Sequence, residues 1–187
     1  MADILTWVVI LAVPLLIVLW FAGIYNGFVK LVNQAKEALA DIDVQLKRRF
    51  DLIPNLLETV KGYASHEKET FDRVTQARTA AMSATGMKGQ AEANDQLTGA
   101  LKSLFAVSEN YPELKAATNF LELQRELSDT EDKIQASRRF YNANVRDLNI
   151  KVQSFPDNIV ANMFGFKVME LYVIADAAQK EAPQVKF

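Results

Sequence analysis

The stretch ILTWVVILAVPLLIVLWFAGIYNGFV, residues 4–29, decides the fold of this chain because it contains no charged residue. A helix needs about 20 consecutive apolar residues to cross the hydrocarbon core of a bilayer. A buried helix of a soluble protein usually shows a polar face, and this stretch shows none before Tyr25 and Asn26. We therefore predict one retained transmembrane helix at the N-terminus, in contact with membrane lipid.

A cleaved signal peptide is the main alternative to a retained anchor. It requires a basic segment before a shorter apolar stretch, followed by small residues at the cleavage site. The first lysine or arginine is Lys30, after the apolar stretch, and Trp20-Phe21-Ala22 matches a cleavage site poorly. The sequence favours the anchor.

Aromatic residues near both ends support the same interpretation. Trp7 lies near one end and Trp20 and Tyr25 near the other, where interfacial aromatic residues are enriched. Ile4 begins the apolar stretch, and Pro14 lies in its middle, where a membrane helix tolerates proline. These five residues are the predicted membrane anchor.

The charges after the span predict its orientation. The N-terminal side offers only Asp3 and the terminal amine, whereas Lys30 and Lys36 follow the span, with Lys47, Arg48 and Arg49 further on. The positive-inside rule places such residues in the cytoplasm. The expected topology has a short N-terminus outside and the main domain in the cytoplasm.

Composition limits the chemistry of the remaining chain. The net charge is −2 and there is no cysteine. Nucleic-acid binding usually requires clustered basic residues, and disulfides, thiolate nucleophiles and cysteine-ligated metals are excluded. Good helix formers are abundant and apolar residues do not alternate at a period of two. The expected class is all-α: one transmembrane helix continuous with an elongated antiparallel four-helix-type bundle with coiled-coil-like packing.

Apolar residues after the span recur at alternating spacings of three and four, which defines a heptad seam. This seam predicts a rigid stalk helix that leaves the membrane. A break is favoured at residues 51–54, because Asp51 can cap a new helix and Pro54 would fall in its first turn; a kink in one continuous helix is the alternative. The seam residues are Tyr25, Phe28, Val32, Ala35, Leu39, Ile42 and Leu46.

Further helices are expected after residue 54. The second runs to about residue 83, a loop with Gly86 and Gly89 covers residues 83–95, and the third spans residues 96–109. Pro112 marks a turn. The predicted domains are an anchor at residues 1–29, a helical bundle domain at residues 30–180 and a C-terminal tail at residues 181–187.

The fourth helix is predicted to be the longest, because apolar residues recur in it every seven positions. Such a repeat indicates left-handed, nearly parallel helix packing. Pro156 and Asp157 end the helix, and Gly165 breaks the apolar segment that follows. The repeat consists of Phe120, Leu127, Ile134, Tyr141, Leu148 and Phe155.

Several blocks of this sequence together resemble the LemA family. They are residues 42–56 (IDVQLKRRFDLIPNL), 60–67 (VKGYASHE), 111–115, 126–131, 139–142, 155–156 and 164–166. The resemblance implies a bacterial inner-membrane protein with one N-terminal span and a long antiparallel helical bundle. It does not imply an enzyme, and we expect no cofactor. Family members often occur in genomic company with membrane proteases or other envelope proteins, which suggests such a partner.

Lys47, Arg48 and Arg49 beside Asp51 form the most distinctive charged cluster. The cluster could bind an anionic headgroup or an acidic partner, but a straight helix would hold it on the order of 30 Å beyond the span. Pairing with carboxylates of the fourth helix is the favoured interpretation. The candidate carboxylates are Glu122, Glu126, Asp129 and Glu131.

Glu131 and Arg138 lie on the apolar stripe of the fourth helix. We expect a buried ion pair between them that fixes the register of the helices. A proton or ion pathway is the alternative, although one span cannot enclose a pore alone.

His66 is the only histidine. Metal sites normally gather three or four ligands, so we expect His66 to be exposed or to cap a turn.

The aromatic residues fall mostly at seam spacing and are expected in the core; Phe71, Phe105, Phe140 and Phe155 are examples. Phe164-Gly165-Phe166 is the exception. Exposed aromatic residues beside glycine could form a contact between subunits, since apolar surface patches commonly mark interaction sites.

The sequence discloses no reaction, so the functional prediction is a non-enzymatic, membrane-anchored scaffold. We expect it to self-associate through stalks and bundles as a homo-oligomer and to organise or shape membrane. One alternative is an adaptor or sensor subunit that acts with a membrane protease or signalling partner. An enzyme is the other, and it would require a pocket of convergent polar groups.

Overall fold

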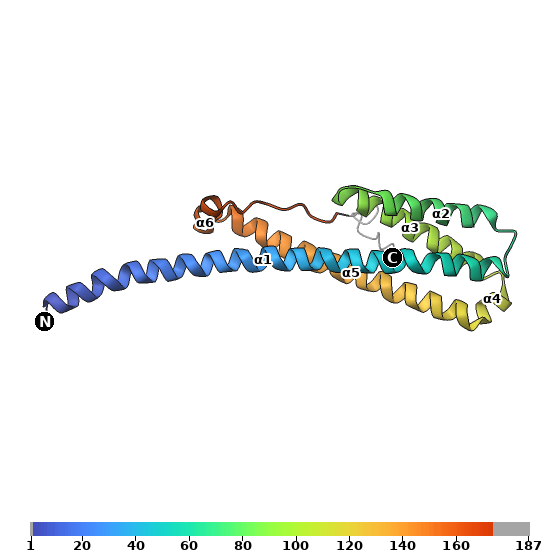
Figure 1. Cartoon of the computed structure of the whole chain (residues 1–187), viewed down its shortest axis with the longest axis horizontal. Helices are drawn as coiled ribbons and strands as arrows, with labels where there is room; N and C mark the ends of the chain where they lie inside the picture. The colour runs from blue at the N-terminus through green and yellow to red at the C-terminus, as the bar shows by residue number, and fades with distance from the viewer. Residues whose placement is uncertain (1, 174–187) are drawn as a thin grey trace, which may run out of the picture. The chain divides into compact units, whose positions relative to one another are not determined.

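The computed structural model describes residues 2–173, except for the side chains of residues 2–5 and 9. In this part of the chain the regular secondary structure consists of helices without any strand (Figure 1). The predicted all-α class is confirmed. The expected tail at residues 181–187 lies outside the described residues. The helices are α1 (Ala2–Lys61), α2 (Lys68–Ser83), α3 (Met87–Ser108), α4 (Pro112–Ala116), α5 (Thr118–Gln153) and α6 (Asp157–Phe164).

The chain forms two compact units, each built from segments that are distant in sequence. Unit 1 combines the residues up to Ala40 with Arg139–Leu171, and unit 2 combines Asp41–Arg138 with the residues from Tyr172. Both α1 and α5 contribute to both units. The domain boundaries predicted after residues 29 and 180 stay predictions.

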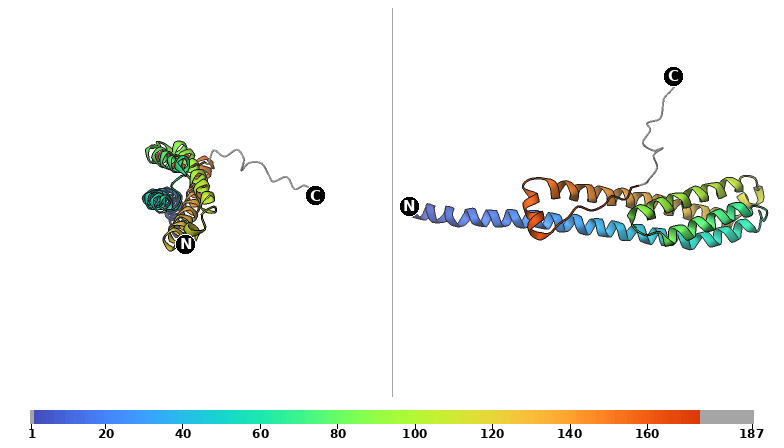
Figure 2. Two further views of the ribbon diagram at one scale, coloured as in Figure 1. Left: turned by 90° about the vertical axis from the view of Figure 1, so that its right-hand side faces the viewer. Right: turned by 90° about the horizontal axis from the view of Figure 1, so that it is seen from above.

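In unit 1, α6 folds back onto α1 next to the apolar stretch (Figures 1 and 2). Its core contains Ile24 and Phe28 of α1, Leu148 of α5, and Val160 and Ala161 of α6. Partly buried apolar residues complete this core: Phe21, Leu31, Val32, Val152, Phe166 and Met169. The first half of the predicted seam therefore packs against the last turns of α5 and against α6.

Unit 2 is an antiparallel bundle of the end of α1, α2, α3 and the first part of α5 (Figure 1). Leucine, isoleucine, valine and phenylalanine dominate its core, as expected for helices packed at heptad spacing. The largest contributions come from Ile53, Leu56, Val60, Phe71, Val74, Leu97, Leu104, Leu114, Phe120 and Leu127.

The break predicted at residues 51–54 is wrong, because α1 continues through Pro54 to Lys61. A proline inside a helix leaves the carbonyl four residues earlier without its backbone donor. Here that carbonyl belongs to Phe50, and Arg78 of α2 donates to it from Nε at 2.8 Å. The neighbouring helix thus replaces the hydrogen bond that Pro54 removes.

The loop predicted at residues 83–95 is also wrong in extent, since α3 already begins at Met87. Only Gly86 in this region has a positive φ, 74°, which glycine adopts without strain. Ala91 and Asn94 are buried within α3. Alanine favours a helix, and the burial of Asn94 within α3 outweighs the weaker helix propensity of asparagine.

Five members of the seven-residue repeat are buried as predicted, from Phe120 to Leu148. Phe155 departs from the prediction: it lies beyond the end of α5 and its side chain is 81% exposed. Phe140 is exposed as well. Gly165, with φ of 74°, ends α6 as expected, and the N–H of Phe166 donates to the carbonyl of Ala161 at 2.9 Å.

Candidate functional site

The apolar N-terminal part of α1 is the first candidate site. Among the described residues, this is a helix that is long and apolar enough to cross a membrane, and only 6% of its most apolar window is buried. The core helix of a soluble domain would be mostly buried. The described side chains of this part of α1 are therefore mostly exposed, as expected for a helix that contacts lipid.

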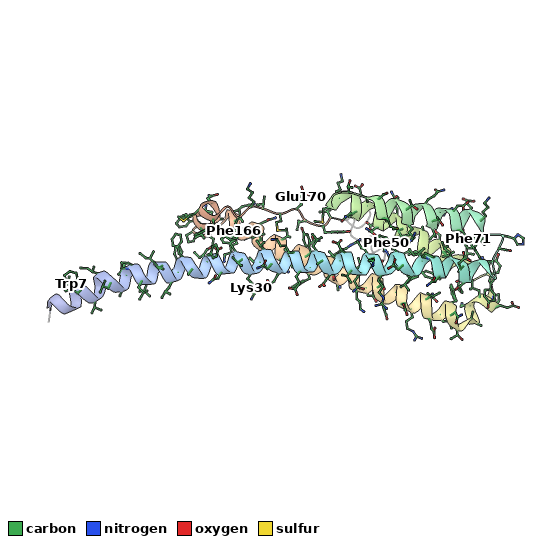
Figure 3. All side chains as sticks on the ribbon, viewed as in Figure 1. Trp7, Lys30, Phe50, Phe71, Phe166 and Glu170 are labelled. Carbon is green, nitrogen blue, oxygen red and sulfur yellow. The ribbon has the colours of Figure 1, made fainter. Side chains whose placement is uncertain are left out.

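The predicted anchor residues lie on this exposed surface. Trp7, Pro14 and Trp20 are exposed, and Trp7 lies near the N-terminal end of α1 (Figure 3). Ile4 is within α1, but its side chain is outside the described part of the chain. Tyr25 differs from the others because its ring centroid lies 4.8 Å from that of Phe164.

The predicted stalk residues pack against other helices of the same chain. Phe28, Ile42 and Leu46 are buried, and Val32 and Leu39 are half-buried. Phe28 also stacks on Phe166 with ring centroids 4.8 Å apart. A second copy of the chain consequently finds little free surface along this seam.

Arg49 organises a buried polar cluster in unit 2. Its side chain is only 1% exposed, and its guanidinium donates to the Glu131 carboxylate of α5 at 2.7 Å and to the Thr98 hydroxyl of α3 at 3.1 Å. It also donates to the side-chain oxygen and the backbone carbonyl of Asn94. One guanidinium thereby joins three helices of the bundle.

Arg138 forms a second buried contact in the same unit. Its Nη1 lies 3.4 Å from the Asp95 carboxylate, and its guanidinium carbon lies 4.7 Å from the centroid of the Tyr172 ring. The Asp95 carboxylate and the face of the Tyr172 ring both attract the positive guanidinium. The predicted register pair between Glu131 and Arg138 is wrong, because each of them pairs with a different helix.

The surroundings of Arg49 affect the pKa of its guanidinium in opposing directions. Burial lowers the pKa of Arg49, Glu131 opposes this shift by its charge and its hydrogen bond, and the nearby Arg138 lowers the pKa further. A guanidinium nevertheless stays protonated in proteins and is a poor acid or base near neutral pH. The hydrogen bonds of Arg49 join α1, α3 and α5, so this geometry can fix these helices relative to one another.

The other signature charges lie at the surface. Lys47 and Asp51 are exposed, and Arg48 forms an exposed ion pair of 3.6 Å with Glu126. Arg48 and Arg49 thus pair with two of the four carboxylates named from sequence. An exposed pair such as Arg48–Glu126 contributes roughly 0–1 kcal/mol.

The polar residues of α3 in the cluster, Asn94, Asp95 and Thr98, were missed from sequence. Asn94 and Asp95 fall in the segment predicted as a loop. A signal was present, since the spacing of Leu97, Leu101 and Leu104 continues backwards through position 94. A polar residue at such a position often marks a buried partner for charge.

His66 is exposed in the connection between α1 and α2. Within the described residues, no group of three or more histidine, aspartate or glutamate side chains could hold a metal ion. Nearby, the hydroxyl of Tyr111 donates to the Glu67 carboxylate at 3.1 Å. This bond raises the pKa of Tyr111.

Phe164-Gly165-Phe166 lies beside α1 in unit 1, where Phe166 is labelled in Figure 3. Phe166 is half-buried against Phe28, while Phe164 remains exposed on one side although it contacts Tyr25. The prediction that both aromatic side chains are exposed is therefore wrong for Phe166. A subunit contact through this segment stays a prediction.

Within the described residues, the exposed apolar N-terminal helix and the internally paired arginine cluster define a class: helical-bundle proteins with a candidate N-terminal membrane span. The LemA family model matches residues 38–187, and the chain belongs to the LemA family. It is 30% identical to Protein LemA of Metamycoplasma hominis over 172 residues, which cover 88% of this chain and 74% of that protein.

Two magnetosome proteins are also similar to the chain. Magnetosome protein MamQ of Magnetospirillum gryphiswaldense and Magnetosome protein MamQ 1 of Paramagnetospirillum magneticum are each 25% identical over 174 residues. The aligned region covers 79% of this chain but only 64% of each relative. Both relatives therefore contain substantial sequence outside the aligned region.

Proposed function

We propose that this protein is a non-enzymatic, membrane-anchored scaffold that self-associates at the bacterial cell envelope and organises or shapes membrane. One observation carries the proposal: the exposed apolar part of α1 belongs to the same uninterrupted helix that packs into both units. The helix that carries the exposed apolar surface therefore also contributes to the packing of both units.

The use of charged residues supports a structural role. The guanidiniums of Arg49 and Arg138 are bound by side chains of the same chain, and each is almost fully enclosed. A substrate would have to displace these partners before it could reach either one. The charged cluster acts as an internal clamp between helices in this proposal.

Membrane attachment favours self-association because it confines all copies to one surface and raises their effective concentration. The predicted contact through the stalk seam requires revision, since most seam side chains are buried inside the chain. We assign the contact to the span and to exposed apolar side chains outside the seam. These side chains include Val44 in unit 2 and Ile150 in unit 1.

Co-isolation of two tagged copies tests this proposal. Full-length protein carrying either of two tags is co-expressed and extracted into native nanodiscs by a polymer, without detergent. Isolation through the first tag is expected to recover the second. Recovery at the level of an unrelated single-span protein would contradict self-association, and a different co-isolated membrane protein would favour the adaptor function.

Matched variants locate the contact. Val44→Glu with Ile150→Glu places two charges on exposed apolar positions and is expected to reduce recovery of the second tag. Asn33→Glu with Gln153→Glu places the same charges at exposed polar positions of the same helices. This control is expected to leave recovery unchanged.

A further inference from the structure

We infer that the corner between α5 and α6 is a second membrane contact, in which exposed apolar side chains enter the interface of the same bilayer that holds the span. The contact surface consists of Phe155 at the corner, Ile159, Met163 and Phe164 of α6, and Val168 in the segment after α6. We call these residues the corner patch.

Position along α1 is the first argument. The uncharged stretch covers residues 4–29, but a helix crosses the hydrocarbon core with about 20 residues. A span that starts at Ile4 ends near Gly23. Within unit 1, α6 packs on Ile24 and Phe28, so the corner lies at the membrane boundary. A span that starts later brings the corner deeper into the bilayer.

Exposure of the corner patch is the second argument. The side chains of Phe155, Met163 and Phe164 are 81%, 64% and 54% exposed. Ile159 and Met163 are four residues apart and therefore share one face of α6, while Val160 and Ala161 face the core of unit 1. A helix with one face on its own protein and an apolar face left open is typical of interfacial helices.

Charge around the patch gives the third argument. Lys30 and Lys167 are exposed in unit 1, and the Lys151 ammonium lies 5.0 Å from the centroid of the Phe28 ring. If the patch enters the membrane interface, these lysines lie at the level of the lipid headgroups and can pair with anionic ones. The patch borders the span itself. If the span lies in a bilayer, the lipid around it therefore also contacts the patch. A second copy would have to exclude that lipid first.

Site-specific fluorescence can test this contact directly, because the chain contains no cysteine. Single cysteines are introduced by Met163→Cys in the patch, Leu11→Cys in the span and Asp147→Cys on α5, all at exposed positions. Each variant is labelled with an environment-sensitive fluorophore and reconstituted as full-length protein into vesicles of neutral and anionic phospholipid. Lipids with a spin label near the headgroup or deep in the acyl chain serve as quenchers.

The expected result is a depth order. Met163→Cys loses fluorescence mainly to the shallow label, Leu11→Cys mainly to the deep label, and Asp147→Cys to neither. Ile159→Glu in the Met163→Cys protein is expected to reduce the shallow quenching. Gln153→Glu, at an exposed position at the end of α5, is the matched control and is expected to leave the shallow quenching of Met163→Cys unchanged.

Two results would overturn the inference. If Met163→Cys behaves like Asp147→Cys while Leu11→Cys is quenched, the anchor is present and the corner contact is absent. If labelled Met163→Cys escapes quenching and the unlabelled variant forms a disulfide with a second copy, the patch is covered by protein instead of lipid. Loss of quenching at Leu11→Cys would contradict the anchor itself and would separate the two proposals.

Discussion

Arg49 illustrates how this bundle accommodates a buried charge. Its guanidinium loses hydration on burial, and Glu131, Thr98 and Asn94 replace the lost water as hydrogen-bond acceptors. A buried ion pair is weak evidence for net stability, because desolvation can cancel the attraction. Removal of one partner is different, since it leaves the remaining polar groups enclosed and unpaired.

Arg49→Met is expected to destabilise the protein by about 3 kcal/mol, because it strands the buried acceptors of Asn94 and Thr98 together with Glu131. Thermal unfolding followed by circular dichroism in one type of nanodisc would measure the change. Arg48→Met removes an exposed pair and is the matched control, with an expected effect of roughly 0–1 kcal/mol. Equal effects of both variants would contradict a special role for Arg49.

Tyr141 gives a pH-dependent prediction. Its buried hydroxyl donates to the carbonyl of Glu170 at 2.9 Å, and burial, followed by the charge of Glu170, raises the pKa of Tyr141. The folded state then holds this proton more tightly than the unfolded state does. The stabilisation is complete below the ordinary tyrosine pKa, about 10, and is lost as pH rises through the raised pKa.

Tyrosinate absorbance measures this shift. The difference between the titration curves of wild-type protein and Tyr141→Phe is expected to have its midpoint above pH 10 in folded protein and near about 10 in denaturant. A midpoint that is the same in both conditions would show that the hydroxyl is not enclosed.

Among the helices, the end of α1 depends on a contact from α2. Pro54 removes the donor for the Phe50 carbonyl, and Arg78 supplies another. Arg78→Ala is expected to cost about 1–3 kcal/mol in the wild-type background, since it leaves a partly buried carbonyl unpaired. In a Pro54→Ala background the backbone donor is restored, so the same change should cost less.

A double-mutant cycle on Pro54 and Arg78 checks this coupling through unfolding free energies. A coupling of at least about 0.5 kcal/mol is expected for groups in direct contact. Additive effects of the two changes would mean that Arg78 does not compensate for the proline.

The segment after α6 is attached to α5 by side-chain to backbone bonds. The Asn149 amide donates to the carbonyl of Met169 at 2.9 Å and accepts from its N–H at 2.8 Å. Asn149→Ala is therefore expected to increase hydrogen exchange in residues 166–171 while helix α3 stays protected. Ile150→Ala at the adjacent exposed position is the control, and equal exchange in both variants would contradict the attachment.

Helices were more predictable from sequence than their ends or their polar contacts. The period of seven located the buried face of α5 from Phe120 to Leu148, because local spacing determines which face of a helix is apolar. The continuity of α1 at Pro54 was unpredictable, since it depends on Arg78 from another helix. The leucine spacing of α3 indicates that position 94 is buried, but the partner of Asn94, Arg49, lies on another helix and local spacing does not identify it.

For the molecule as a whole, the candidate membrane span and residues that pack into both units belong to one helix, α1. The predicted span agrees with the exposed apolar surface of this helix. The proposed scaffold adds one claim to that architecture: several copies stand together in one membrane.

Mass and shape of the full-length protein, extracted gently from its native membrane, test this central claim most directly. Size measurement and electron microscopy of the extracted particles report the number of copies in each. We expect a regular assembly of several bundles that lie side by side on one membrane patch. Particles that contain a single bundle would contradict the scaffold function.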